Sequence, residues 1–286
     1  MHRFGNGSLS VAVKAAGAEL VSLSAGGTEL LWQAGPAWPR HAPVLFPIVG
    51  RLADDTLLHD GRRFRMTQHG FARDRAFDWL DRTADGCRLR LTEDPHSLAL
   101  YPFRFALEIA YRIEGPRLSV DYTLRNPGDA VLPASIGAHP AFRWPLADDL
   151  GKPAHRLVFE RPEPAPIRRV AGGLLRPDSP PSPIEGRVLA LNDALFADDA
   201  VILDRLASRS VRYEADGAPD ALTVGWHGME QLGIWSKPGA DFLCIEPWHG
   251  LASPAGFTGD FVDKPGLMRL APGEERRLGW SVVVGP

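Results

Sequence analysis

The sequence has few cysteines, no excess of charge of one sign and no long apolar run. Its two cysteines, Cys87 and Cys244, stand far apart and outside any CxxC arrangement. One disulfide is possible, but a disulfide framework is excluded, and we expect both thiols to be small buried side chains. Lys and Arg number 32 against 35 Asp and Glu, a net charge of −3, so no overall field attracts nucleic acid or an anionic membrane.

Membrane insertion and export are also not indicated. No apolar stretch approaches the roughly 18 residues needed to span a bilayer, and residues 1–7 lack the apolar run of a signal peptide. We therefore expect a cytoplasmic protein that binds neither nucleic acid nor membrane.

Glycine and proline, by contrast, are plentiful. The chain has 29 Gly and 26 Pro in 286 residues, above the usual combined share of roughly 12%, which predicts many turns between short strands. Apolar and polar side chains alternate along 103–112 and 118–125, on either side of Glu114-Gly115-Pro116, as in an antiparallel hairpin. Further short strands are predicted at 9–13, 20–23, 88–91, 157–159, 201–203, 222–224, 242–245 and 278–284.

This pattern predicts an all-β protein, a large antiparallel β-sandwich in which two sheets pack face to face. Sandwiches of this length commonly form one domain, so we expect residues 1–286 to be a single domain. The proline-rich residues 162–183 are interpreted as a long surface loop within it. Residues 195–206 fit a short helix or, over 201–203, a strand equally well.

Several familiar catalytic signatures are missing. The chain contains no GxSxG, GxxxxGKS/T, GxGxxG or HExxH pattern, so nothing supports a nucleophile-elbow hydrolase, a P-loop or Rossmann enzyme, or a zincin. What remains are polar residues within apolar, turn-rich segments. These segments are PVLFPIVGRL with Arg51, QHGFAR with His69 and Arg73, SIGAHPAF with His139, and LCIEPWHG with Glu246.

Each of these residues also has a purely structural interpretation. A single imidazole such as His69 or His139 is more often structural than catalytic, and Arg51 serves equally well to tie down a buried loop. Glu246 is harder to explain, because a carboxylate that directly follows an apolar strand is costly to bury unpaired. Glu246 and His249 form at most half of a metal site, since the local sequence supplies no third ligand, so we expect no metal.

Together these segments resemble the aldose 1-epimerase (galactose mutarotase) family, most closely its bacterial branch of shorter, LacX-like proteins. The resemblance rests on PVLFPIVGRL, HGFAR, GAHPAF, CIEPWHG and the tail GFTGDFVDKPG, which occur here in the family's order. Any one motif is weak, but five in order cover most of the chain. The resemblance implies a galactose mutarotase-like β-supersandwich with a sugar cleft on one face, in agreement with the strand pattern.

The resemblance also implies a cofactor-free isomerase that interconverts the α and β anomers of a free hexose such as glucose or galactose. A hemiacetal ring opens when a base removes the C1 hydroxyl proton while an acid protonates the ring oxygen. Glu246 is similar to the family's general base and His139 to its general acid. We expect them on opposite sides of the ring, where an imidazolium facing a carboxylate would raise the pKa of His139 and lower that of Glu246.

Other residues resemble the family's sugar-binding positions. Arg51 and His69 match positions that hydrogen-bond the sugar, and Trp248 offers an apolar face for stacking. An aspartate that binds hydroxyls falls in the FADDA segment, where we favour Asp199 over the adjacent Asp198.

One departure from the better-known mutarotases leaves the substrate open. Phe71-Ala72-Arg73 follows the His-Gly pair where those proteins usually have Gly, so Arg73 either contacts substrate or braces the loop that carries His69. Further arginines nearby form either a solvated face or a phosphate site, as in the related hexose-6-phosphate epimerases; they are Arg62, Arg63, Arg65 and Arg75. A non-catalytic sugar-binding or sensor protein of this fold is a third hypothesis. The chain is expected to be a monomer or homodimer.

Overall fold

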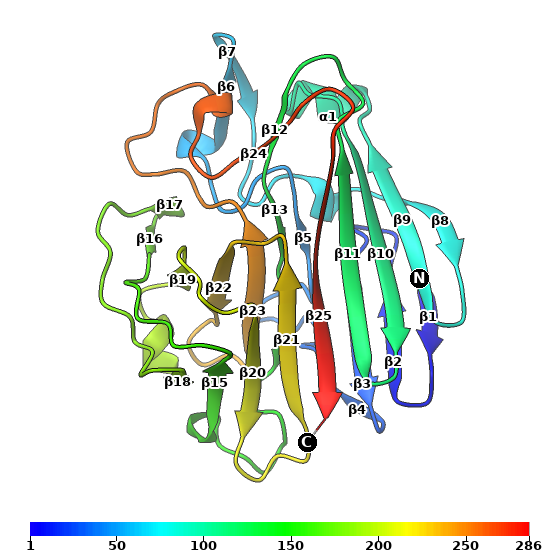
Figure 1. The fold of residues 1–286 in the computed structure, drawn as a ribbon, viewed down its shortest axis with the longest axis vertical. Coiled ribbons are helices and arrows are strands. Elements are labelled where there is room, and N and C mark those ends of the chain that lie inside the picture. Colours follow the sequence, from blue (N-terminus) through cyan, green and yellow to red (C-terminus); the bar gives the residue numbers. More distant parts are fainter. Residues whose placement is uncertain (286) are drawn as a thin grey trace.

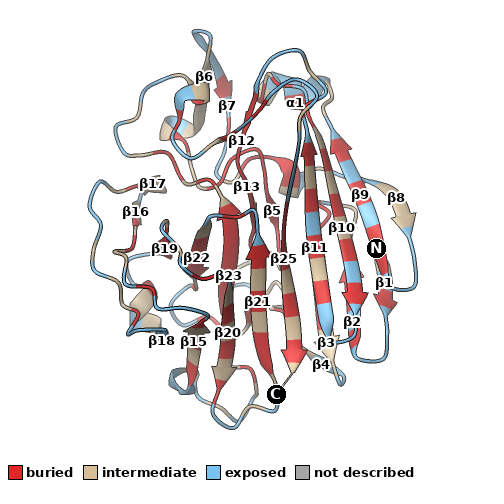
Figure 2. Cartoon of the chain, viewed as in Figure 1, coloured by how far each residue is buried: buried red, intermediate tan, exposed pale blue. Residues whose placement is uncertain are grey.

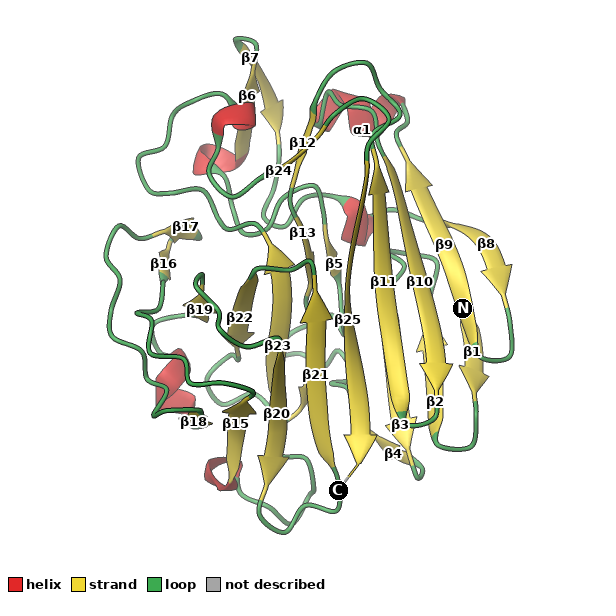
Figure 3. Ribbon diagram, in the orientation of Figure 1, coloured by secondary structure: helices red, strands yellow, loops and turns green. Residues whose placement is uncertain are grey.

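A computed structural model describes residues 1–285 and consists mainly of antiparallel strands (Figure 1, Figure 3). The largest sheet has nine strands in the order β18-β15-β20-β21-β25-β11-β10-β9-β8. Its members are β8 (Asp78–Arg82), β9 (Gly86–Thr92), β10 (Ala106–Glu114), β11 (Arg117–Arg125), β15 (His155–Phe159), β18 (Val188–Ala190), β20 (Ser210–Ala215), β21 (Ala221–His227) and β25 (Glu275–Gly285).

The predicted hairpin is β10 and β11. Glu114 pairs with Arg117, which leaves Gly115 and Pro116 as the turn, and Gly115 has the left-handed backbone (φ +54°) that glycine adopts at no steric cost. Buried residues alternate with more exposed ones along both strands, because one face of this sheet lies on the core. The alternation in the sequence therefore predicted both strands, although the first begins at Ala106 rather than at Phe103.

A second sheet contains six strands and has β23 at its centre. The order is β19-β22-β23-β13-β5, and β14 also pairs with β23. All but the last residue of β23 are buried, and the strand is almost uniformly red in Figure 2. The members are β5 (Val44–Leu45), β13 (Ile136–Ala138), β14 (Ala141–Arg143), β19 (Val201–Leu203), β22 (Gln231–Trp235) and β23 (Phe242–His249).

The two sheets share one hydrophobic core. Leu243 and Ile245 of β23 belong to the same buried cluster as Leu107 and Val120 of the nine-stranded sheet. Side chains alternate along a strand, so Cys244, Glu246 and Trp248 lie on the other face of β23, away from this core. The all-β sandwich prediction is confirmed. The cluster contains residues from Phe4 to Val284.

The remaining strands form four smaller sheets. The four-stranded sheet contains β1 (His2–Gly5), β2 (Leu9–Val13), β3 (Leu20–Ala25) and β4 (Thr28–Glu29). The three two-stranded sheets are β6 (Thr56–His59) with β7 (Arg62–Arg65), β12 (Leu132–Ala134) with β24 (Met268–Leu270), and β16 (Val170–Ala171) with β17 (Leu174–Leu175). The helix α1 (Pro95–Leu100) begins with a capping box between Asp94 and Ser97. No helix within 1–285 is long and apolar enough to cross a membrane.

The eight short segments predicted as strands all lie in strands, and two local interpretations are now settled. Residues 201–203 are the strand β19, preceded by a 3₁₀ helix at Asp193–Phe196, so the strand alternative was right. Residues 162–183 are more than a surface loop, because Ile167 and Leu175 are buried and Arg168 pairs with Ile202 of β19. This segment also brings β16 and β17 to the open face of the second sheet.

Candidate active site

A cavity of about 290 Å³ opens on the face of the six-stranded sheet that turns away from the core. This volume is near the lower end of the roughly 300–1,000 Å³ usual for small-molecule sites. Six of the seven residues proposed from the sequence line it; the full lining is Trp38, Val49, Gly50, Gln68, His69, Arg73, His139, Val170, Gly173, Asp199, Ala200, Ile202, Trp235, Glu246, Trp248 and Ala252.

Strand β23 supplies the floor of this cavity. Glu246 and Trp248 lie two residues apart and therefore on the same face of the strand. Gly233 of β22 pairs with Glu246, and Gly137 of β13 pairs with Trp248. A Cβ atom would lie 2.3 Å from the Trp248 ring at Gly233 and 2.5 Å from it at Gly137. Two glycines on the neighbouring strands thus leave the space that the indole fills.

His139 is held between two tryptophans that the sequence analysis did not single out. It lies in the link between β13 and β14, and its ring stacks on Trp38, with centroids 4.9 Å apart and planes at 25°. Trp235 of β22 meets the same ring edge-on at 5.9 Å. Both contacts join residues distant in sequence, so no local motif signals them. Together they fix the plane of the imidazole.

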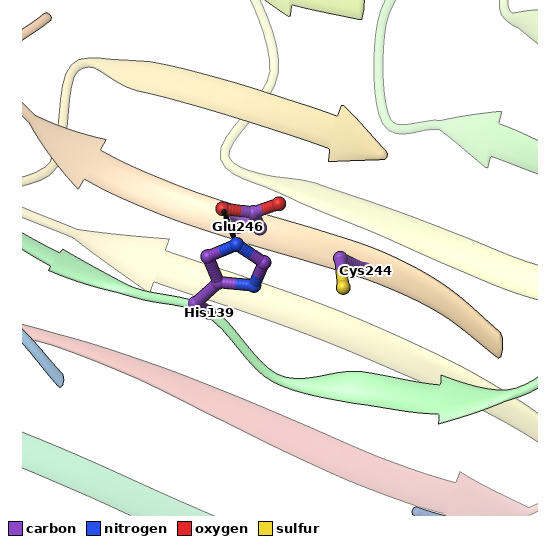
Figure 4. A group of neighbouring side chains, drawn as sticks. All are labelled: His139, Cys244 and Glu246. Atoms are coloured by element: carbon purple, nitrogen blue, oxygen red, sulfur yellow. Dashed lines mark ion pairs between the residues drawn. The ribbon is translucent and has the colours of Figure 1, made fainter. Parts of the chain in front are cut away.

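His139 and Glu246 contact each other directly. Nε2 of His139 lies 3.2 Å from Oε2 of Glu246 (Figure 4), with 9% and 1% of the two side chains exposed. Within the described residues, neither Oε2 of Glu246 nor Nδ1 of His139 has a hydrogen-bond partner. The expected pair therefore lines one cavity, but the two side chains touch each other in its wall, where opposite sides of a sugar ring were expected.

The pKa shifts also run opposite to the sequence-based expectation. Burial raises the pKa of Glu246 well above its usual value, and the nearby Asp199 charge adds to this rise while the Trp248 indole opposes it. Burial lowers the pKa of His139 to about 3, with a further contribution from the Arg73 charge. Loss of solvation outweighs the attraction within the pair. Burial thus works against charge on both side chains, raising the pKa of the carboxyl and lowering that of the imidazole.

His69 presents one defined ring nitrogen to the cavity. The Gly50 N–H donates to Nδ1 of His69 at 3.2 Å, which places the proton of the neutral ring on Nε2; Nε2 lies 3.3 Å from the side-chain amide of Gln68, which also lines the cavity. Burial is the main cause that holds the pKa of His69 well below its usual value, and the positive charge of Arg73 adds to it. The residue adopts a left-handed backbone (φ +65°) next to Gly70, where a Cβ would lie 2.3 Å from the Phe46 carbonyl oxygen.

Arg73 both braces the His69 loop and lines the cavity. Its Nη2 donates to the Gln68 carbonyl at 2.6 Å, directly before His69. Burial, with a contribution from the Arg40 charge, lowers the pKa of Arg73 to about 10. The guanidinium therefore stays charged near neutral pH and keeps a positive charge beside the two imidazoles.

Asp199, rather than Asp198, faces the cavity. Asp199 has a left-handed backbone (φ +62°) and its Oδ1 accepts from the Ala200 N–H at 2.7 Å, whereas Asp198 turns outward to Arg176 at 2.8 Å. Arg169, which no sequence motif indicated, binds the backbone of this loop. Its guanidinium donates to the carbonyl oxygens of Asp199, Asp198 and Leu195 at 2.6, 3.2 and 3.1 Å.

Arg51 is the proposed site residue that the structure does not bring to the cavity. Its Nε and Nη2 donate to the two carboxylate oxygens of Asp55 at 2.7 and 3.0 Å, and its side-chain stem packs against Gly173. This two-point contact turns the charge away from the cavity lining. The arginines considered for phosphate binding do not line the cavity either: Arg62, Arg63 and Arg65 belong to β7, and Arg75 pairs with Asp94.

The family relationship follows from comparison with known proteins. The model of the aldose 1-epimerase family matches residues 1–275. This chain belongs to the aldose 1-epimerase family.

Relatives of this epimerase-family chain match it over nearly its full length. The chromosomal LacX protein of Lactococcus lactis subsp. lactis is 29% identical over 288 residues, covering 96% of each chain. The structure of a galactose mutarotase related enzyme from Lactobacillus acidophilus superimposes with a TM-score of 0.93 at 29% identity, covering 100% of this chain and 97% of that one. A galactose mutarotase-like protein from Lactobacillus casei gives 0.92 at 28%, with 99% of each covered. The predicted mutarotase-like fold and the likeness to LacX are confirmed.

Proposed function

We propose that this chain is an aldose 1-epimerase that interconverts the α and β anomers of a free hexose such as glucose or galactose. The observation that carries the proposal is the contact between His139 and Glu246, 3.2 Å apart in the wall of a cavity suited to one small molecule. Anomerisation needs one group that accepts a proton and one that donates it, and this pair supplies both.

The geometry suits a hemiacetal because the two oxygens that exchange protons, the C1 hydroxyl and the ring oxygen, are bonded to the same carbon. An acid and a base that touch can therefore each reach one of them. Transfer of a proton from Oε2 of Glu246 to Nε2 of His139 creates the carboxylate and imidazolium without changing the total charge of the pair. Oriented sugar hydroxyls stabilise these charges in place of water.

The proposed reaction then balances with one shared proton. Glu246 takes the proton of the C1 hydroxyl while His139 protonates the ring oxygen, the C1–O5 bond breaks, and a carbonyl forms at C1. The pair is again a protonated carboxyl and a neutral imidazole. Rotation about C1–C2 and the reverse transfers close the ring with the opposite configuration. Each proton transfer role contributes roughly 10²–10⁴ in rate.

The remaining lining suits recognition of an uncharged pyranose. Trp248 offers an apolar ring face for the C–H face of the sugar, the Nε2–H of His69 donates, and Asp199 accepts from hydroxyls. Among the described lining residues, Arg73 is the only arginine or lysine. A phosphate dianion is usually bound by several such cations or by a two-point arginine contact, so the cavity favours a free hexose over a 6-phosphate.

Polarimetry tests the proposal. The optical rotation of freshly dissolved α-D-glucose, α-D-galactose and α-D-glucose 6-phosphate is followed with and without protein. We expect faster relaxation for at least one free hexose and little effect on the phosphate. Acceleration of the phosphate alone would favour the hexose-6-phosphate epimerase. Saturable sugar binding with no acceleration of any of them would favour the non-catalytic sensor.

A further inference from the structure

The proposed reaction leaves unused a thiol next to the acid–base pair. Cys244 precedes Glu246 by two residues on β23 and lies on the same face of the strand. It is a free cysteine and is fully buried. Its Sγ and one ligand atom each from His139 and Glu246 all lie within 4.8 Å of one another. Figure 4 draws the three side chains together.

We propose that His139, Cys244 and Glu246 form a binding site for a thiophilic divalent transition-metal ion such as Zn²⁺, and that the bound ion inhibits the protein. Binding requires only these three side chains. The inhibitory effect rests on the proposed function, because a metal on His139 and Glu246 takes the lone pairs that the proton transfers use.

The donor set suits zinc in type and nearly in spacing. Zinc binds thiolate, imidazole and carboxylate at about 2.0–2.3 Å, which places neighbouring ligand atoms of a tetrahedral site roughly 3.3–3.8 Å apart. The His139–Glu246 contact of 3.2 Å already matches this spacing, and the longer separations close by about 1 Å through side-chain rotation. His139 and Glu246 line the cavity, whereas Cys244 does not, so an ion bound here would be reached from the cavity on the side of His139 and Glu246.

Two further observations point to a ligand here. Oε2 of Glu246 is buried and, within residues 1–285, makes no hydrogen bond, although it lies 3.2 Å from Nε2 of His139, and such groups normally make one. The charges also balance, because one thiolate and one carboxylate neutralise a divalent cation in a buried place where net charge is costly. The Cys244 thiol proton and any proton on Glu246 pass to solvent. A sulfur ligand excludes hard cations such as Mg²⁺, which prefer oxygen.

The chain provides a matched control for the test. Cys87 is also free and buried, but it belongs to the main core cluster on β9. The full chain and the variants Cys244→Ser, Cys244→Ala and Cys87→Ser are dialysed against ZnCl₂ and their metal content is measured. We expect one zinc per wild-type and Cys87→Ser chain, and at least about 10-fold weaker binding in both Cys244 variants. MgCl₂ is expected not to bind at this site.

Two independent readouts keep the outcome clear. Wild-type protein loaded with Co²⁺ should show a sulfur-to-cobalt charge-transfer band, which does not depend on whether a variant folds. In mutarotation assays, zinc should slow the wild type and Cys87→Ser, whereas Cys244→Ser keeps its basal rate with zinc present. Equal zinc binding by all variants would overturn the proposal and direct attention to His59, Asp60 and Asp260, which also cluster within 4.8 Å. Absence of both zinc binding and the cobalt band would overturn it outright. If the protein has no mutarotase activity, dialysis and the cobalt spectrum still decide binding.

Discussion

Trp38 stacks on His139, with ring centroids 4.9 Å apart and planes at 25°. Trp38 itself is anchored, because the Trp32 indole N–H donates to its carbonyl at 2.7 Å. The imidazole that contacts Glu246 is therefore held in one plane by an aromatic wall. This wall comes from the chain between β4 and β5, which no catalytic motif marks.

The first prediction concerns this stack. Trp38→Leu removes the aromatic face and allows the imidazole to tilt away from Glu246, so kcat should fall by about 3- to 10-fold, in line with about 0.5–1.5 kcal/mol for an aromatic pair. Trp38→Phe keeps a stacking ring and should retain most of the activity. Initial rates of mutarotation at saturating sugar measure the effect. Equal losses in both variants would mean that stacking is not what matters.

The second prediction concerns the space under Trp248. Gly233→Ala introduces a Cβ that would lie 2.3 Å from the indole, so the ring must shift and the sugar loses its stacking face. We expect KM to rise by about 10-fold, with a smaller change in kcat. Gly151→Ala is the control, because the nearest atom to its new Cβ lies 3.7 Å away. Unchanged KM in Gly233→Ala would show that Trp248 does not contact the sugar.

The third prediction concerns Arg169, a positioning residue. Arg169→Lys keeps the charge but cannot reach all three carbonyl oxygens of the Asp199 loop, and Asp199 should then lose its orientation. We expect KM to rise by about 10-fold, equivalent to about 1.4 kcal/mol, with kcat changed much less. Arg161→Lys, at a side chain 66% exposed, is the control. A fall in kcat and stability without a change in KM would assign Arg169 a purely structural role.

The fourth prediction concerns stability and pH. The pKa of Glu246 is raised in the folded protein. Above the ordinary carboxyl pKa, the folded state therefore keeps a proton that the unfolded state releases. The free energy of unfolding then falls as pH rises from the ordinary pKa toward the raised pKa of the folded state. Glu246→Gln removes this cost. Its melting temperature should exceed that of the wild type near pH 7 by about 2–4 °C for each kcal/mol gained, and the difference should shrink toward pH 4. A variant that melts lower at pH 7 would contradict the shift.

Much of the fold followed from the sequence because alternation with a period of two is a local property. The alternation within residues 106–125 shows by itself which side chains face the core and which face solvent. The turn at Gly115-Pro116 fixes the register of the two strands. Residues 162–183 were predicted to be a surface loop because of their many prolines. Proline content does not show that Ile167 and Leu175 in this segment are buried in the protein.

The site was predictable only in part, for physical reasons. Glu246 and Asp199 stand out because carboxylates in apolar or strained segments need a partner. Trp38, Trp235 and Arg169 act through contacts with distant residues, which single-chain patterns do not encode. The sequence did not reveal that Asp55 binds the guanidinium of Arg51, so that Arg51 does not line the cavity. The pKa directions of His139 and Glu246 were reversed because they depend on depth of burial, which spacing does not report.

The most direct test of the central claim compares His139→Asn, Glu246→Gln and the double variant in polarimetric assays, with folding of each checked by circular dichroism. If the two side chains share one proton and act as a unit, each single variant should lower kcat by at least roughly 10², and the double variant should be little worse than either. Multiplicative losses in the double variant, or a folded single variant with nearly full activity, would contradict the account.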